Sequence, residues 1–177
     1  CSKEENLELF HASCAGMGLT GIIISAKIKL LKIKSKLIDT EIVKTKNLDE
    51  TIKNFTKFNK NKYLVAWIDA LAKKEHIGRS IIFIGNHSDQ GDLNFLENIK
   101  FSIPKIFPGF LLNNYVIKSF NKFYYFFHKN KKVKQSLDNF FYPLDGIGNW
   151  NNLYGKKGFI QIQILFTEKN FQEVIRK

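Results

Sequence analysis

The sequence is poor in cysteine, arginine and long apolar runs. Its 177 residues include only two cysteines, Cys1 and Cys14, which excludes a disulfide framework. Neither cysteine lies in a Cys/His pattern, and the four histidines are dispersed, so we expect no metal site. No apolar run approaches the length of a membrane span, and no signal peptide is visible.

The charge is strongly positive, yet it comes almost entirely from lysine. The 28 basic residues include two arginines, Arg79 and Arg176, which leaves 26 lysines and a net charge of +12. Arginine is the preferred residue for bidentate recognition of phosphates and bases, so its scarcity argues against a nucleic-acid partner. The lysines are scattered except for the run Lys129–Lys134. They are typical of a solvated face with some attraction for anionic lipid or phosphate.

The composition predicts a packed globular protein, and the order of its predicted elements indicates the α+β class. The chain is 44% hydrophobic and has 17 phenylalanines, which favours a globular body over disorder. Two strands that follow a helix and are joined by a short connection predict an antiparallel sheet flanked by helices. The chain leaves the first predicted strand near Lys34, so we assign residues 1–35 to one domain and residues 36–177 to a second. The predicted strands are Thr20–Leu31, Leu37–Val43, Lys62–Ile68, Arg79–Asn86 and Gly158–Phe166, and the predicted helices are Asn47–Phe58, with Asn47 as its cap, and Glu168–Lys177.

Two other segments are less regular. Pro104 and Pro108 break the region between residues 100 and 111 into a loop or short turns. The aromatic segment Tyr115–Phe127 fits a helix or a strand, since its periodicity favours neither.

Three closely spaced glycines precede the first predicted strand. Gly16, Gly18 and Gly21 run directly into Ile22–Ile24, which predicts a tight turn that feeds a buried strand. Glycine also lets the main chain approach a ligand closely. A structural turn and a cofactor site both fit this pattern, which lacks the spacing of a dinucleotide fingerprint.

The unit from Glu8 to Leu30 resembles the end of the flavin-binding domain in FAD-linked oxidases of the vanillyl-alcohol oxidase type. That family repeats an acidic-Leu-Phe start, a glycine-rich turn and a Gly-Ile-Ile strand, and Ala15 stands where the pattern has glycine. Further motifs follow in the order and approximate spacing of the same family. They are Tyr63–Asp69, Gly78–Arg79, Phe141–Asp145, Trp150–Asn151, Tyr154–Gly155 and Gly158–Gln163.

The resemblance implies an FAD-dependent oxidoreductase in which the cofactor carries the hydride chemistry. It also implies that residues 1–35 are the end of the FAD-binding domain and that residues 36–177 are a substrate (cap) domain, incomplete at its C-terminus. In this family a loop that holds the flavin pyrophosphate lies upstream and an active-site lysine lies downstream of the matched region. We therefore expect this chain to be an internal fragment, inactive and unable to bind FAD tightly alone. The principal catalytic base is expected outside it.

The same resemblance implies site residues. Gly18, Gly21 and Ile23 match positions at the cofactor, although Ile23 also fits an ordinary core strand. The substrate-binding positions are Trp67, Phe141, Leu144, Gly148, Trp150, Asn152, Gln161 and Gln163. A buried tryptophan is more often plain core. Phe141 replaces a tyrosine and Asn152 an arginine of a related oxidase, which changes two polar contacts. Gln161 and Gln163 share one face of their predicted strand. If that face is buried, their side-chain amides need hydrogen-bond partners; the alternative is a face exposed to solvent.

For the whole protein, the resemblance implies oxidation of a secondary alcohol of a sugar on a polyprenyl phosphate. The expected reaction is at carbon 2 of ribose during synthesis of an arabinose donor, with a partner reductase completing the epimerisation. A bacterial location in the cytoplasm or at the inner membrane follows, and the aromatic run Phe120–Phe127 with its lysines suits a peripheral membrane contact. Two alternatives stay open: an oxidase of an alditol, aldonolactone or hydroxy acid, and a non-catalytic basic binding module.

Overall fold

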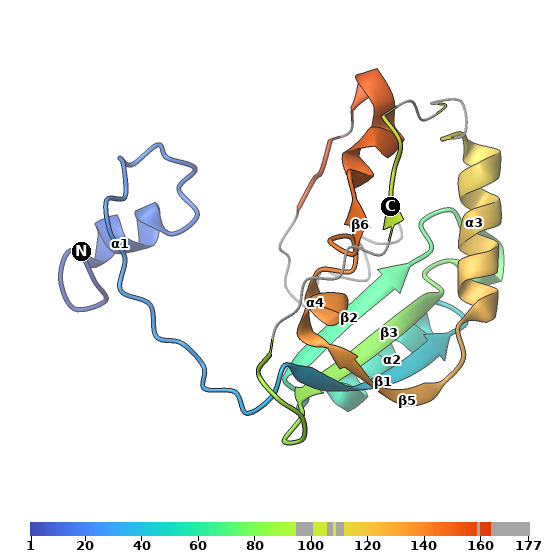
Figure 1. Cartoon of the computed structure of the whole chain (residues 1–177), viewed down its shortest axis with the longest axis horizontal. Coiled ribbons are helices and arrows are strands. Elements are labelled where there is room, and N and C mark those ends of the chain that lie inside the picture. Colours follow the sequence, from blue (N-terminus) through green and yellow to red (C-terminus); the bar gives the residue numbers. More distant parts are fainter. Residues whose placement is uncertain (95–100, 106–107, 109–111, 159, 164–177) are drawn as a thin grey trace. The chain divides into compact units, whose positions relative to one another are not determined.

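A computed structural model describes residues 1–94, 101–105, 108, 112–158 and 160–163. The chain divides into two compact units, Cys1–Lys32 and Ile33–Lys177 (Figure 1).

The first unit contains one short helix and an extended segment. Helix α1 (Leu7–Ser13) ends in a turn where Ala15 and Met17 have positive φ angles of 60° and 52°. Gly16 is required there, because a Cβ atom would lie 2.4 Å from the carbonyl oxygen of Ala12. The prediction of a buried strand over Thr20–Leu31 is wrong: residues 21–30 have no regular structure, and Ile22 is 94% exposed. A strand needs a hydrogen-bonding neighbour, and no described strand pairs with this segment.

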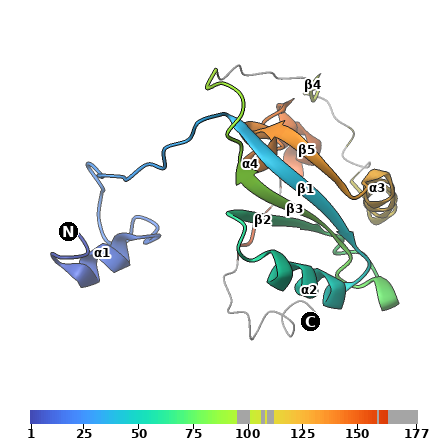
Figure 2. The ribbon, with the colours of Figure 1, turned by 90° about the horizontal axis from the view of Figure 1, so that it is seen from below.

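The second unit is built on a four-stranded antiparallel sheet, which confirms the predicted α+β class. Its strand order is β2-β3-β1-β5 (Figure 2). The strands are β1 (Leu37–Thr45), β2 (Tyr63–Ile68), β3 (Ser80–His87) and β5 (Lys131–Ser136). The first three match predicted strands closely. β5 falls on the lysine-rich run that we took for a solvated face, and it pairs with the outer side of β1.

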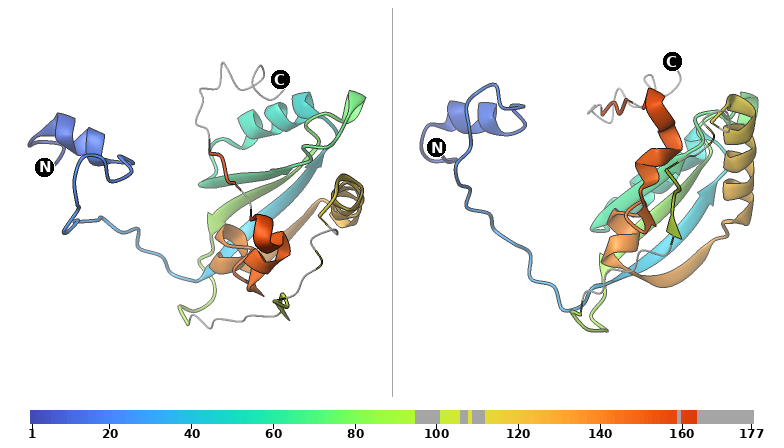
Figure 3. Two further views of the ribbon diagram at one scale, coloured as in Figure 1. Left: turned by 90° about the horizontal axis from the view of Figure 1, so that it is seen from above. Right: turned by 45° about the horizontal axis from the view of Figure 1, so that its top comes forward.

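Helices cover the two faces of this sheet. Helix α2 (Leu48–Phe58) lies on one face and α4 (Leu137–Phe141) on the other (Figure 3). Helix α3 (Asn114–Phe127), the aromatic segment whose type was left open, contacts the same face as α4. The core contains isoleucines of the two central strands, among them Ile38, Ile81 and Ile82, which are fully buried.

Helix α2 starts as the sequence predicts. The side chain of Asn47 accepts a hydrogen bond from the backbone N–H of Glu50 at 3.0 Å. Behind the helix, the hydroxyls of Thr45 and Thr51 lie 2.6 Å apart, and the Thr51 hydroxyl also donates to the carbonyl of Gly78 at 2.9 Å. These buried hydroxyls are hydrogen-bonded and so fix the helix on the sheet at little desolvation cost.

A smaller two-stranded element follows in the sequence. β4 (Phe101–Ser102) and β6 (Ile147–Gly148) pair in parallel, and 3₁₀ helix η3 (Trp150–Lys157) follows β6. Another 3₁₀ turn, η1 (Lys74–His76), precedes β3. The predicted strand Gly158–Phe166 is wrong where it is described, because residues 160–163 are exposed and irregular. The predicted helix Glu168–Lys177 lies outside the described residues.

Candidate functional site

The candidate site is the sheet face that contacts α3 and α4. Alternate residues of a strand point to the same side, and the strand register puts Tyr63, Val65 and Trp67 of β2 on the same side of the sheet as Phe83 and His87 of β3. We call these five residues the aromatic face. Val65 is 45% exposed, so the middle of this face is open among the described residues.

One end of the aromatic face is closed by α4. The ring of Tyr63 packs edge-on against Phe141, with centroids 4.8 Å apart, and against His87 at 5.4 Å. Phe140 is buried and sits on Gly85, where a Cβ atom would lie only 2.6 Å from the phenylalanine ring. Gly85 thus leaves room for α4 to lie flat on the sheet.

His87 is the unusual polar group of this cluster. Its Nε2 lies 2.9 Å from the hydroxyl of Tyr63, whereas its Nδ1 is buried without a described partner. Burial, with the charge of Lys62 as a second cause, lowers the pKa of His87 below its ordinary value. The side chain is therefore a neutral imidazole at pH 7 that shares a hydrogen bond with the Tyr63 hydroxyl. Sequence reasoning missed it, because nothing local pairs His87 with Tyr63; only the register of β2 and β3 does.

The other end of the aromatic face is closed by α3. Trp67 packs against Tyr124, with ring centroids 4.9 Å apart, and Phe83 lies edge-on to His128 at 6.1 Å. Burial raises the pKa of Tyr124, so its hydroxyl stays protonated at neutral pH. Trp67 follows Tyr63 by four residue steps along β2, or about 13 Å. The structure thus brings the predicted site residues Trp67 and Phe141 to one face, at opposite ends of an apolar floor.

An ion pair at the end of the sheet holds α3 in this position. Asp69 is buried, and its Oδ2 accepts hydrogen bonds from Nε and an Nη of Arg79 at 2.9 and 2.6 Å. Its Oδ1 accepts from Nδ2 of Asn121 on α3 at 2.7 Å. The guanidinium also lies 4.8 Å from the ring centre of Tyr125 on the same helix. The sequence motifs contained Asp69 and Arg79, but their role as the anchor of α3 was not predicted.

A second group of predicted residues lies on the β6–η3 segment. The carbonyl of Gly148 accepts from the N–H of Ile103, and the side-chain amide of Asn152 donates to the carbonyl of Ile103 at 3.1 Å. Trp150 packs edge-on against Tyr154, at 6.0 Å. Leu144 is half-exposed in the preceding turn. Gly148 and Asn152 therefore both bond the backbone of Ile103, and the side-chain amide of Asn152 already donates a hydrogen bond there.

The remaining predicted residues are exposed. Gln161 and Gln163 lie in irregular structure open to solvent, so the prediction of a shared strand face for them is wrong. In the first unit, Gly18 and Gly21 have φ angles of 76° and 137°, and nothing lies within 4 Å of a Cβ atom built on either. Ile23 is 68% exposed.

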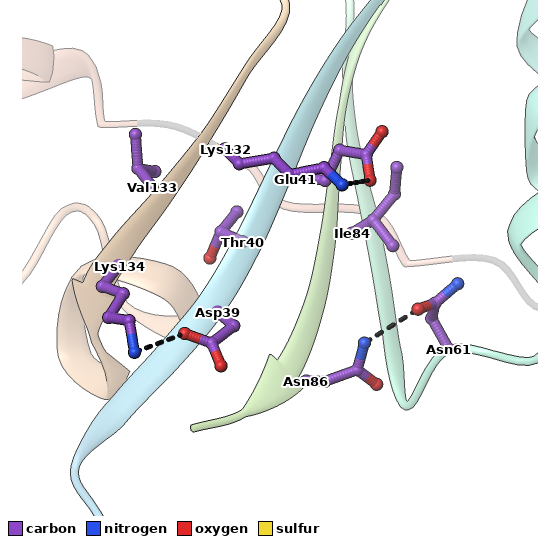
Figure 4. A pocket seen from close by; sticks show the side chains of 9 residues that line it. All are labelled: Asp39, Thr40, Glu41, Asn61, Ile84, Asn86, Lys132, Val133 and Lys134. Atoms are coloured by element: carbon purple, nitrogen blue, oxygen red, sulfur yellow. Dashed lines mark hydrogen bonds and ion pairs between the residues drawn. The ribbon is translucent and has the colours of Figure 1, made fainter. Parts of the chain in front are cut away.

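The opposite face of the sheet has a polar hollow of about 410 Å³ (Figure 4). Its charged side chains neutralise one another: Lys134 lies 3.3 Å from Asp39, and Lys132 lies 3.8 Å from Glu41. This self-paired surface offers little free charge to a ligand. Over the described ranges, no group of three or more His, Cys, Asp or Glu residues is arranged to hold a metal. None of the helices that the structure describes is long and apolar enough to cross a bilayer.

The chain is related to an oxidoreductase. It is 31% identical, over 178 aligned residues, to decaprenylphosphoryl-β-D-ribose oxidase of Mycolicibacterium smegmatis (strain ATCC 700084 / mc(2)155). The alignment covers 94% of this chain and 39% of the relative, so the chain spans well under half the length of that protein. The resemblance to an oxidase of this kind is thereby confirmed. The chain matches no protein-family model.

Proposed function

We propose that this chain is part of an FAD-dependent oxidoreductase that oxidises a secondary alcohol of a polyprenyl-phosphate-linked sugar. The observation that carries the proposal is the aromatic face: Trp67 and Phe141, two positions matched to the oxidase family, lie on one side of the sheet with an open apolar floor between them. The relative's name, which specifies a ribose on a decaprenyl phosphate, supports the substrate class. Aromatic side chains suit the apolar faces of a sugar ring.

The glycine-rich turn of the first unit fits an FAD contact. The open space at Gly18 and Gly21 would let a ligand approach the backbone, and their positive φ angles disfavour any other residue. The chemistry that FAD supplies when bound is acceptance of a hydride from the alcohol carbon. This chain would contribute backbone contacts at Gly18, Gly21 and Ile23, and the aromatic face would orient the sugar. Flavin-site residues beyond this chain would complete the cofactor site.

One observation favours a different alcohol as substrate. Asn152, at a position where a related oxidase has arginine, is uncharged, and its amide donates to the backbone of Ile103. It therefore supplies no cation for a phosphate group. An alditol, an aldonolactone or a hydroxy acid would not need that contact, so these substrates form the second candidate class.

The test is anaerobic reduction of the flavin in the natural full-length protein. We expect polyprenyl-phosphoribose to bleach the flavin band, and Trp67→Leu to slow this bleaching about tenfold or more through lost substrate orientation. Lys53→Gln on α2, which contacts the opposite face of the sheet, is the matched control and should react normally. Bleaching only by an alditol, aldonolactone or hydroxy acid would assign the second class. An unchanged rate in Trp67→Leu would refute the role of the aromatic face.

A further inference from the structure

Helix α3 has an inverted polarity. The side that contacts the sheet makes polar and ring contacts: Asn121 donates to Asp69, and the Tyr125 hydroxyl donates to the carbonyl of Thr45 at 3.0 Å. The side that points away is apolar. Its exposed members, with exposures from 42% to 85%, are Tyr115, Val116, Phe120, Phe123, Phe126 and Phe127. Globular helices normally point such residues inward. We call these six residues the outer face of α3.

The chain segment that carries the outer face has charges of one sign only. From Leu112 to Leu137 the sequence has six lysines and no aspartate or glutamate. Lys118 and Lys122 lie one turn apart on α3, and Lys129 and Lys131 follow its end. None of these four lysines takes part in a described salt bridge. An exposed aromatic strip beside unpaired lysines is the composition of a helix that lies in a membrane interface.

A basic hollow adjoins the end of α3. It has a volume of about 780 Å³ and is lined by Phe126 and Phe127 together with Lys44, Lys46 and Lys129. Its one acidic residue, Glu50, already accepts a hydrogen bond from the backbone N–H of Lys46 at 2.7 Å. The Nζ atom of Lys44 lies 4.2 Å from the ring centre of Tyr125, and burial, with the charge of Arg79 as a second cause, lowers the pKa of Lys44. The hollow is thus suited to a phosphate-containing headgroup beside two apolar rings.

We propose that the outer face of α3 binds the surface of an anionic lipid bilayer. The phenylalanines would enter the boundary of the acyl chains, and Lys118, Lys122 and Lys129 would contact headgroup phosphates. The charge pattern decides in favour of this occupant, because a protein partner would need a matching acidic surface whereas an anionic bilayer supplies negative charge along the whole helix. The inference does not depend on the proposed oxidation, since lipid binding requires neither flavin nor substrate.

The test is co-sedimentation of the natural full-length protein with vesicles. We expect binding to equimolar phosphatidylcholine and phosphatidylglycerol, weak binding to phosphatidylcholine alone, and release by salt. The double change Lys118→Gln and Lys122→Gln should weaken binding about tenfold or more. The matched control is Lys53→Gln with Lys57→Gln on α2, which removes the same charge at the same spacing and should bind like the parent chain.

A second pair of changes tests the apolar part. Phe123→Ser with Phe126→Ser should abolish vesicle binding, while the circular dichroism of the fold stays unchanged because both side chains point away from the sheet. Binding that persists in this variant, or that falls equally in the α2 control, would overturn the proposal. Self-association through the same phenylalanines without any binding to vesicles would also overturn it. That result would assign the outer face to contact with a second copy of the protein.

Discussion

Replacing Arg79 by methionine tests the ion pair that fixes α3 on the sheet. The Arg79 and Asp69 side chains are 18% and 2% exposed, and the change removes two hydrogen bonds of 2.9 and 2.6 Å from the carboxylate. Breaking a buried pair by deleting one partner costs about 3–5 kcal/mol. Asn121 and the N–H of Leu71 still donate to Asp69, at 2.7 and 3.1 Å, so we expect the lower end, about 3 kcal/mol.

The assay is urea unfolding followed by circular dichroism and by tryptophan fluorescence, since Trp67 packs against Tyr124 of α3. Lys73→Met, an exposed cation on the same loop, is the matched control and should change the unfolding free energy by less than about 0.5 kcal/mol. Asp69→Asn combined with Arg79→Met removes the unpaired charge of the buried carboxylate and should recover part of the lost unfolding free energy. A cost below about 1 kcal/mol for Arg79→Met, or no recovery in the double variant, would refute the reasoning.

Three further predictions concern stability. Gly85→Ala should lower the unfolding free energy by about 1–3 kcal/mol in urea titrations, because its Cβ would lie 2.6 Å from Phe140; Gly146→Ala, whose nearest contact is 3.8 Å, should be nearly neutral. Asn47→Ala should lower the melting temperature through loss of a helix cap worth about 1 kcal/mol, and an unchanged melting temperature would contradict the cap. The pKa of His87 is lowered in the folded state, so the unfolded state binds the proton more tightly. The free energy of unfolding should therefore be highest well above pH 6.5 and should fall as the pH drops through the unfolded pKa of about 6.5. His87→Gln should flatten this pH dependence in urea titrations across that range, and an unchanged slope would show that other groups cause it.

Local sequence patterns were enough to predict helix α2 and the strands β1, β2 and β3. Asn47 before an amphipathic stretch predicted the start of α2, and the short apolar stretches of β1, β2 and β3 predicted three strands to within a few residues. The apolar residues of these elements pack against one another in the core, and each element carries its own local sequence signal. For that reason their pattern is visible without the tertiary structure.

The failures share a physical cause, which is dependence on distant partners. β5 consists largely of lysine and glutamine and forms a strand only because the edge of β1 offers it hydrogen bonds. Thr20–Leu31 looks like a strand but has no described neighbour. Helix α3 was ambiguous because both of its sides bear aromatic rings, which hides the helical period.

The candidate site was predicted only in part. Trp67 and Phe141 were identified by resemblance, and the structure brings them to one face. His87 and Asn121 were missed because their partners, Tyr63 and Asp69, are 24 and 52 residues away in the sequence. Such contacts follow from strand register and helix docking, which local patterns do not encode.

The most direct test of the central claim is the visible absorption spectrum of the purified natural full-length protein, recorded anaerobically before and after addition of polyprenyl-phosphoribose. We predict a flavin band that bleaches on addition of this substrate. A protein that contains no flavin after purification and gains none when FAD is added would contradict the account.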